Sequence, residues 1–229
     1  LGSLVKKEKL TQEQADARLA EVMALVTGTT SYDEFGDVDF VIEAVPEKMA
    51  IKQAVFAEPL AAALHVLDDL EQAGGAAADP DESVVVVGDG KLGQLIARAI
   101  AGTGRLAIVV GRHEHKLALA NDGGAATLHE SGALAALLPS AAVVDATGSA
   151  SGLALALALT RPKGLVILKT TVAASEAKAI DLSPIVINEL RVVGSRCGDL
   201  ARAMDMLRTG AVDPRPLIAI GLLCIAASA

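Results

Sequence analysis

Short apolar runs alternate with apolar residues at helical spacing over most of the chain. A β-branched run such as V-V-V-V predicts a strand that is buried on both faces of a parallel sheet. Apolar residues three and four positions apart predict the helices between these strands. We therefore expect an α/β fold, a doubly wound parallel sheet with strand order 3-2-1-4-5-6. The expected strands are 84–88, 106–110, 126–130, 141–148, 163–170 and 190–195, and the expected helices are 60–72, 91–102, 114–120, 151–160 and 200–210, with one helical turn in 131–138.

The first 58 residues carry a separate and shorter pattern. An amphipathic period predicts a helix over 11–26, an apolar run predicts a strand over 38–45, and a helix is expected over 47–57, where Pro59 interrupts it. We expect this helix–strand–helix unit to be an appendage of the sheet. Glycine, alanine and proline at 74–83 predict a loop. The expected organisation is an N-terminal segment (1–58), a helix and linker (59–82), the sheet domain (83–218) and an apolar tail (219–229).

The expected strand at 84–88 runs directly into the glycine pattern G-D-G-K-L-G. Gly88 permits a tight turn, Gly90 lets a pyrophosphate approach the backbone, and Gly93 lets the following helix pack closely on the strand. That helix offers free N–H groups and the positive end of its dipole to phosphates. Strand, glycine turn and helix together indicate a Rossmann dinucleotide site, although a bare glycine pattern also fits an ordinary βα turn. We assign cofactor binding to Gly88, Gly90, Lys91, Leu92 and Gly93.

The end of the second expected strand bears on which dinucleotide binds. An Asp or Glu about 20 residues beyond the glycine motif would bind the ribose 2′-hydroxyl. Here Gly111 and Arg112 stand at that place. Because glycine leaves room for a 2′-phosphate and arginine can form two bonds to it, we predict NADP(H), with NAD(H) as the alternative. Lys116 would assist, unless Lys116 and Arg112 are ordinary surface charges.

The carboxyl ends of the remaining strands complete the crevice of a doubly wound sheet. Polar residues stand at three of these ends, and we expect them to contact the cofactor or to be ordinary strand-to-loop residues. They are Thr147, Gly148, Lys169, Thr170, Ser195 and Arg196. The sequence predicts no catalytic residue.

Composition narrows the class of protein further. Of the 229 residues 52% are hydrophobic and only 2% are aromatic, so the core must be built from small aliphatic side chains, which suits α/β layers. The net charge is −8 without a dense basic run, so we expect no nucleic-acid partner. The longest apolar run, 217–229, is too short to span a bilayer. We expect a cytoplasmic protein with no membrane partner and, because the chain begins at Leu1, a fragment or a processed form.

Cysteine and histidine residues are too scattered to predict a metal site. Cys197 and Cys224 cannot form a disulfide framework or a four-cysteine zinc site. His113 and His115 lie two positions apart on an expected loop, where they could bind a metal, but two exposed loop histidines explain them better. We therefore predict no zinc.

Several blocks in order resemble the coenzyme-binding half of the zinc-type (medium-chain) alcohol dehydrogenases. They are G-D-G-K-L-G, V-V-G-R-H-E-H-K-L-A-L-A, V-V-D-A-T-G-S, P-K-G-L-V-I-L-K-T-T and V-V-G-S-R-C-G, and the resemblance runs from about residue 60 to 218. The resemblance implies a Rossmann fold and hydride transfer between a nicotinamide cofactor and an alcohol or carbonyl substrate. It also makes a homodimer plausible, in which the last strands of two chains pair. The zinc ligands of that family lie in its catalytic domain, which has no counterpart in this sequence.

The first 58 residues resemble a different family, the 3-hydroxyacyl-CoA dehydrogenase domain of the bacterial fatty acid oxidation complex. The strand D-F-V-I-E-A-V and the helices on either side of it match the second half of that family's Rossmann domain, whose own glycine motif is missing here. The catalytic His–Glu pair of that family also has no match. Glu47 and Lys52 match residues that approach the cofactor in that family, and otherwise form a solvated helix face.

The two resemblances compete for one place in the sheet. The segments 37–45 and 140–148 share an apolar strand followed by a carboxylate and alanine. In each family this is the fourth strand, beside the glycine-motif strand, and one sheet has only one such slot. We expect 141–148 to fill the slot and 38–45 to lie at an edge or in a loosely packed appendage. The chain is then a fusion, an engineered recombinant or an artefactual reading frame.

The sequence as a whole predicts an NAD(P)-binding, oxidoreductase-type domain without a complete catalytic site. Two alternatives stay open. One is a 3-hydroxyacyl-CoA dehydrogenase-like enzyme in which the fused domain supplies the glycine loop. The other is a non-enzymatic binding module or a recombined fold. We expect turnover of a substrate to be weak or absent.

Overall fold

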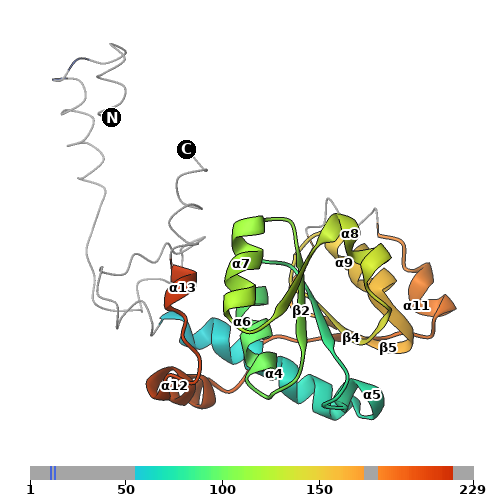
Figure 1. Cartoon of the computed structure of the whole chain (residues 1–229), viewed down its shortest axis with the longest axis horizontal. Helices are drawn as coiled ribbons and strands as arrows, with labels where there is room; N and C mark the ends of the chain where they lie inside the picture. The colour runs from blue at the N-terminus through green and yellow to red at the C-terminus, as the bar shows by residue number, and fades with distance from the viewer. Residues whose placement is uncertain (1–10, 12, 14–54, 173–179, 219–229) are drawn as a thin grey trace. The chain divides into compact units, whose positions relative to one another are not determined.

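A computed structural model describes residues 11, 13, 55–172 and 180–218 of the chain. Contacts divide the chain into two units, Leu1–Ala44 and Val45–Ala229, and the described residues other than 11 and 13 belong to the second unit. The predicted strand at 38–45 and most of the two predicted helices beside it lie outside the described residues. The described part of the second unit is a parallel sheet with helices on both faces (Figure 1).

The sheet has six strands in the order β3-β2-β1-β4-β5-β6, and every neighbouring pair is parallel, which confirms the predicted doubly wound topology. The valine strand β1 pairs with β2 on one side and with β4 on the other, where Val84 faces Ala107 and Ala142. The slot beside the valine strand is therefore filled by β4, as predicted. The strands are β1 (Val84–Val87), β2 (Ala107–Gly111), β3 (Ala126–His129), β4 (Ser140–Asp145), β5 (Thr160–Leu168) and β6 (Arg191–Gly194).

Helices cover both faces of the sheet because each connection crosses over to a parallel strand (Figure 1). Buried residues of α4, α6, α7 and α12 pack against one face, and those of α8 and α9 pack against the other. No helix within the described ranges is long and apolar enough to cross a membrane. The helices are α4 (Ala57–Ala73), α5 (Gly75–Ala78), α6 (Lys91–Ala101), α7 (Glu114–Asp122), α8 (Glu130–Ala136), α9 (Ala150–Leu159), α11 (Ser183–Ile187), α12 (Leu200–Thr209) and α13 (Arg215–Ile218).

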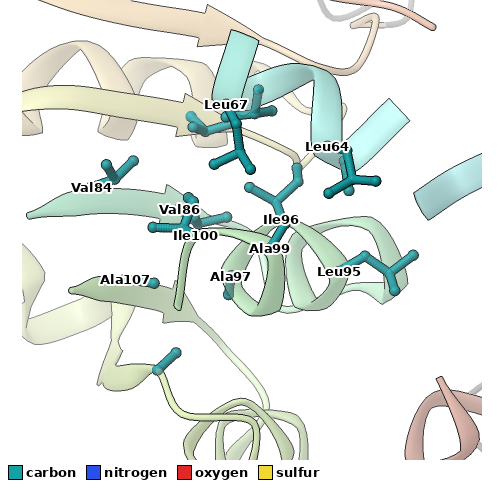
Figure 2. Packing of buried hydrophobic residues seen from close by; sticks show 14 of the residues in the cluster. Leu64, Leu67, Val84, Val86, Leu95, Ile96, Ala97, Ala99, Ile100 and Ala107 are labelled. Carbon is teal, nitrogen blue, oxygen red and sulfur yellow. The ribbon is translucent and has the colours of Figure 1, made fainter. Parts of the chain in front are cut away.

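The valine run divides its side chains between the two cores, because successive residues of a strand point to opposite faces. Val84 and Val86 belong to the cluster that includes α4 and α6, whereas Val85 and Val87 belong to the cluster on the other face. Figure 2 shows the first cluster, in which Val86 lies beside Ile96 and Ile100 of α6. Burying each such aliphatic side chain contributes about 1.5–3 kcal/mol. This packing fixes α6, and with it the glycine turn, on the end of β1.

Two local predictions before the sheet are wrong. Pro59 does not interrupt a helix, because α4 begins at Ala57 and takes Pro59 into its first turn, where the missing proline N–H removes no helical hydrogen bond. The predicted loop at 74–83 contains the short helix α5, and its alanines have high helix propensity. The buried Arg105 stabilises this segment, since its guanidinium donates to the carbonyl oxygens of Ala77 and Glu82.

Two strand boundaries also differ from the prediction. Strand β5 begins at Thr160 rather than 163, because the pairing of β4 with β5 shifts register between Ser140 and Ala142. Strand β4 ends at Asp145 rather than 148, because the Asp145 carboxylate accepts a hydrogen bond from the N–H of Thr147 and turns the chain. The polar residues after β4 therefore belong to a turn at the carboxyl edge of the sheet.

Candidate functional site

A crevice lies at the carboxyl ends of β1, β2 and β4, where the strand order of the sheet reverses. This switch point is the place where open α/β sheets bind ligands. Five of the residues that the sequence assigned to a cofactor line it: Gly88, Gly90, Gly111, Arg112 and Thr147. The full lining is Val87, Gly88, Asp89, Gly90, Val110, Gly111, Arg112, His113, Glu130, Ala146, Thr147, Ser149, Ser151 and Gly152.

The three glycines of the motif have three different steric roles. Gly88 has a φ of 120°, and a Cβ there would lie 3.0 Å from the carbonyl group of Ala146. A Cβ on Gly93 would overlap the carbonyl oxygen of Gly88, so this glycine permits the close approach of α6 to the turn. A Cβ on Gly90 would meet nothing within 4 Å and would stand in the crevice. Contacts within the protein therefore do not require a glycine at position 90.

Helix α6 begins directly at the crevice, with Lys91 and Leu92 in its first turn after the N-cap Gly90. The first N–H groups of a helix lack intrahelical acceptors, so they are available to an anion. Two side chains of the same helix hold α7 in place. The buried Gln94 donates to the carbonyl oxygen of Lys116 (2.7 Å), and Arg98 donates to that of Leu119 (2.8 Å).

A carboxylate lies at the end of β2, although it comes from the glycine motif. Asp89 Oδ2 accepts hydrogen bonds from the N–H groups of Arg112 and His113, both at 2.8 Å. Gly111 makes this possible, since a Cβ at that position would lie 2.5 Å from the Asp89 side chain. Burial by itself would raise the pKa of Asp89, but the bonds from His113 and Arg112 outweigh it and hold the pKa below its ordinary value.

Two basic side chains near the end of β2 each lie beside a carboxylate. The Arg112 side chain is 57% exposed, and its Nε lies 3.5 Å from the carboxylate of Glu130 in the first turn of α8. Lys116 Nζ lies 3.9 Å from Asp89 Oδ1. Arg112 lines the crevice and Lys116 does not, and each has a carboxylate close by.

The turn after β4 is built on the buried carboxylate of Asp145. Thr147 donates to Asp145 Oδ1 through its backbone N–H (3.0 Å) and its hydroxyl group (2.7 Å). The next residue, Gly148, has a φ of 69° and donates its N–H to the hydroxyl oxygen of Thr170 at the end of β5 (2.7 Å). Asp145 therefore positions Thr147, and Gly148 joins the ends of β4 and β5.

We expect Asp145→Asn to stabilise the protein at neutral pH. Burial raises the pKa of Asp145 against the opposing bonds from Thr147. A carboxyl group with a raised folded-state pKa contributes stability at low pH that is lost as the pH rises through that pKa, so the ionised form is costly at pH 7. Asparagine keeps the acceptor without the charge. Urea unfolding should show a free energy of unfolding about 1 kcal/mol higher for the variant than for the unmodified protein at pH 7. This difference should vanish near pH 3.

The exposed Asp205 provides the control for this prediction, because Asp205→Asn removes a surface carboxylate paired with Arg208. This substitution should change the free energy of unfolding by no more than about 0.5 kcal/mol. A gain for Asp145→Asn that is equal at pH 3 and pH 7 would show that the charge is not the cause.

A second group of predicted residues comes together at the ends of β5 and β6. Lys169 Nζ donates to Ser195 Oγ (2.9 Å) and to the carbonyl oxygen of Arg196 (2.8 Å). Burial lowers the pKa of Lys169, opposed by the negative charge of Asp69 and other neighbouring groups. This group joins the last two strands, and it is separate from the residues that line the crevice at β1, β2 and β4.

The described residues bring together no group of three His, Cys, Asp or Glu side chains that could hold a metal ion. His113 and His115 approach each other with ring centroids 6.0 Å apart, and Nδ1 of His113 is hydrogen-bonded to Asp89. Cys197 is a free, exposed thiol, and Cys224 lies outside the described residues. The predicted absence of zinc stays a prediction.

Nine of the residues that line the crevice were not assigned to a cofactor from the sequence, and Asp89 and His113 are two of them. From the sequence, an acid was expected only at the end of the second strand, about 20 residues beyond the glycine motif. One signal was present in the sequence. The glycine motif contains an acid, Asp89, and the second strand ends in a glycine, Gly111, which leaves the space that the Asp89 side chain fills.

Sequence comparison matches the N-terminal part of the chain. Residues 1–65 match the family model of the 3-hydroxyacyl-CoA dehydrogenase, NAD binding domain. The fatty acid oxidation complex subunit alpha of Pseudomonas entomophila is 47% identical over 58 residues, which are 25% of this chain and 8% of that protein. The corresponding subunit of Pseudomonas syringae pv. tomato is 45% identical over the same length. The predicted resemblance of the first 58 residues is thereby confirmed.

Structural comparison matches the sheet. L-idonate 5-dehydrogenase from Escherichia coli has a TM-score of 0.63 at 23% identity, covering 75% of this chain and 50% of that one. A putative zinc-binding dehydrogenase from Sinorhizobium meliloti, bound to NADP, has a TM-score of 0.61 at 27% identity, covering 70% and 49%. An alcohol dehydrogenase from E. coli CFT073, complexed with NADH, has a TM-score of 0.60 at 24% identity, covering 76% and 52%.

This chain therefore spans about half the length of its structural neighbours and a small part of its curated relatives. The chain thus joins a segment that matches the NAD-binding domain of 3-hydroxyacyl-CoA dehydrogenases to a Rossmann fold similar to that of zinc-binding and alcohol dehydrogenases.

Proposed function

We propose that the crevice at β1, β2 and β4 binds a nicotinamide dinucleotide. The observation that supports this most directly is the space at Gly90, beside the N-terminus of α6 and in the lining of the crevice. The residues present fit a pyrophosphate, because its charge would meet the N–H groups and the positive dipole end of the helix. Gly88, Gly90, Lys91, Leu92 and Gly93 would hold the phosphates, with Gly111, Arg112 and Lys116 at the adenosine end.

The remaining predicted residues would hold the other half of the dinucleotide. Thr147 and Gly148 follow β4, and Lys169, Thr170, Ser195 and Arg196 follow β5 and β6, on the far side of the switch point. Hydride chemistry would be supplied by the bound nicotinamide. We infer an oxidoreductase-type domain for an alcohol or carbonyl substrate, with no assigned group that carries the substrate proton.

NADP(H) is the form of the cofactor that we propose, with NAD(H) as the alternative. The half-exposed Arg112 supports this form, because its guanidinium can bond two phosphate oxygens. The space beside Gly111, which the sequence left open for a 2′-phosphate, is filled by the Asp89 carboxylate and therefore does not favour NADP(H). The putative zinc-binding dehydrogenase from S. meliloti binds NADP and the E. coli CFT073 enzyme binds NADH, so both forms occur among similar folds.

Titration of NADPH and NADH, followed by their fluorescence, tests the proposal directly. The Arg112→Ala variant should bind NADPH about tenfold more weakly and NADH less than about twofold more weakly, because only the 2′-phosphate uses the guanidinium. Arg208→Ala is the matched control, since this exposed arginine on α12 pairs with Asp205. Equal losses for both nucleotides would contradict the assignment of Arg112, and no binding at millimolar concentration would refute the proposed function.

A second candidate is 3-hydroxyacyl-CoA dehydrogenase-like activity, which the match of residues 1–65 favours. In this case the glycine turn of β1 and α6 would supply the glycine loop that the matched N-terminal segment lacks. Oxidation of NADH or NADPH in the presence of acetoacetyl-CoA distinguishes this candidate from an alcohol dehydrogenase-like domain. Cofactor binding without turnover of either substrate class would indicate a binding module.

A further inference from the structure

The pair of Asp89 and His113 stands at the part of the crevice where the adenosine ribose is expected. Asp89 is almost closed off from solvent, with 8% of its side chain exposed, whereas 49% of the His113 side chain is exposed. Both residues line the crevice together with Gly88 and Gly90. One member of the pair is therefore anchored in the protein, and the other is accessible to a ligand.

The hydrogen bonds of Asp89 determine which nitrogen of His113 carries the proton. Both carboxylate oxygens lie 3.0 Å from Nδ1 of His113. An ionised carboxylate only accepts hydrogen bonds, so Nδ1 must be the donor. In the neutral ring Nε2 is then an acceptor, and in the protonated ring Nε2 is a second donor.

These two forms of the ring suit two different ribose substituents. A 2′-hydroxyl group can donate a hydrogen bond to a neutral Nε2. A 2′-phosphate only accepts at neutral pH, so it needs a donor and gains from a positive charge. Because gaining a proton turns Nε2 from an acceptor into a donor and makes the ring positive, the preference between the two substituents should change with pH.

We propose that Asp89 and His113 form a pair that selects between NADPH and NADH through the protonation of the His113 ring, an inference that rests on the proposed function. Asp89 positions the ring and fixes its donor nitrogen. Protonated His113 favours NADPH, and neutral His113 favours NADH. The selector comes from the glycine motif and the β2–α7 turn together, rather than from a single acid at the end of β2.

Charged and titratable side chains of α7, α8 and β3 lie around His113. Lys116 of α7 lies against the Asp89 carboxylate, and Arg112 lies against Glu130 of α8, so these two cations each face a carboxylate. His115 of α7 approaches the His113 ring edgewise, and His129 of β3 lies with Nε2 3.2 Å from the carbonyl oxygen of Arg112. A proton on His113 thus adds a positive charge to a group of side chains whose charges otherwise balance.

The test is to measure the dissociation constants of NADPH and NADH between pH 5.5 and 8.5. In the unmodified protein the affinity for NADPH relative to NADH should fall about tenfold over this range, the effect of losing one positive charge beside a phosphate. The free 2′-phosphate becomes more negative as the pH rises, which by itself would strengthen its binding to cations. A fall therefore reports on the protein and not on the ligand.

Three variants separate the pair from its surroundings. In the His113→Gln variant, the affinity for NADPH relative to NADH should change less than about twofold over the pH range. The neighbouring His115→Gln variant should retain the tenfold change of the unmodified protein. Asp89→Asn should weaken the binding of NADPH at pH 5.5 more than the binding of NADH, because the protonated His113 ring loses its carboxylate partner. Thermal unfolding of each variant checks that the fold is retained.

Each outcome bears on the proposal. A relative affinity that does not change with pH, or that changes equally in His113→Gln, would overturn it. So would stronger NADPH binding by Asp89→Asn, since the carboxylate would then act by repelling the phosphate. If neither nucleotide binds the unmodified protein, the proposed function fails together with the inference, whereas binding with a pH-independent preference refutes the inference alone.

Discussion

Gly93→Ala is expected to lower the free energy of unfolding by about 3 kcal/mol, because the added methyl group overpacks the contact between α6 and the glycine turn. The Cβ would overlap the carbonyl oxygen of Gly88, which is backbone and cannot rotate away as a flexible side chain can. Relief would require α6 to move away from β1. This movement would disturb the packing of Ile96 and Ile100 on Val86, which Figure 2 shows. Urea unfolding measures the loss.

Gly132→Ala is the matched control for this variant. Gly132 lies in α8, and a Cβ there would meet nothing within 4 Å. Alanine in a helix is favoured over glycine by up to about 1 kcal/mol, so this substitution should leave the stability unchanged or raise it. If Gly93→Ala unfolds at the same urea concentration as the unmodified protein, the close approach of α6 does not restrict residue 93.

Gly90→Ala is expected to weaken cofactor binding about a hundredfold while it leaves the fold intact. A Cβ on Gly90 would contact no protein atom within 4 Å, and the φ of −70° is accessible to alanine. The stability cost, that of a poorer helix N-cap, should stay within about 1 kcal/mol. In the crevice, however, the methyl group would stand where a pyrophosphate approaches the N–H groups of α6.

The expected loss of affinity follows from the bonds that the methyl group would prevent. A hydrogen bond to a charged group contributes about 1.5–3 kcal/mol, so the loss of one or two weakens binding about a hundredfold. Fluorescence titration of NADPH measures this effect, with Gly132→Ala as the control for binding as well. Undiminished binding by a folded Gly90→Ala protein would mean that the phosphates do not lie at this turn.

The contrast between these two glycines illustrates how much the motif alone could predict. The spacing of the glycines and the apolar runs on either side correctly placed a strand, a turn and a helix. The same spacing assigned a role to each glycine, and the steric surroundings of Gly88 and Gly93 agree with those roles. The ligand role of Gly90 stays a prediction, because it depends on a molecule that occupies the crevice.

Predictions failed where the local sequence was compatible with two conformations. Alanines and glycines at 74–83 suit a loop and a short helix alike, and the packing of Ala77 with the bonds of Arg105 favours the helix. Proline breaks a helix interior but fits a first turn, so Pro59 could not by itself indicate on which side of it α4 begins. The start of β5 depends on a register shift against β4, which no pattern within β5 shows.

The sequence by itself determined the parallel sheet, its strand order and the place of the glycine turn, because buried β-branched runs, helical periods and glycine spacing are local properties of the chain. Only the tertiary structure decided that an acid stands at the end of β2. Asp89 and Gly111 are distant in sequence, and they meet because β1 and β2 pair in parallel with Val87 opposite Val110. The carboxylate then fills the space that glycine leaves and holds His113 at the crevice. The cofactor preference that we propose thus depends on strand register, which the spacing of residues along the chain does not contain.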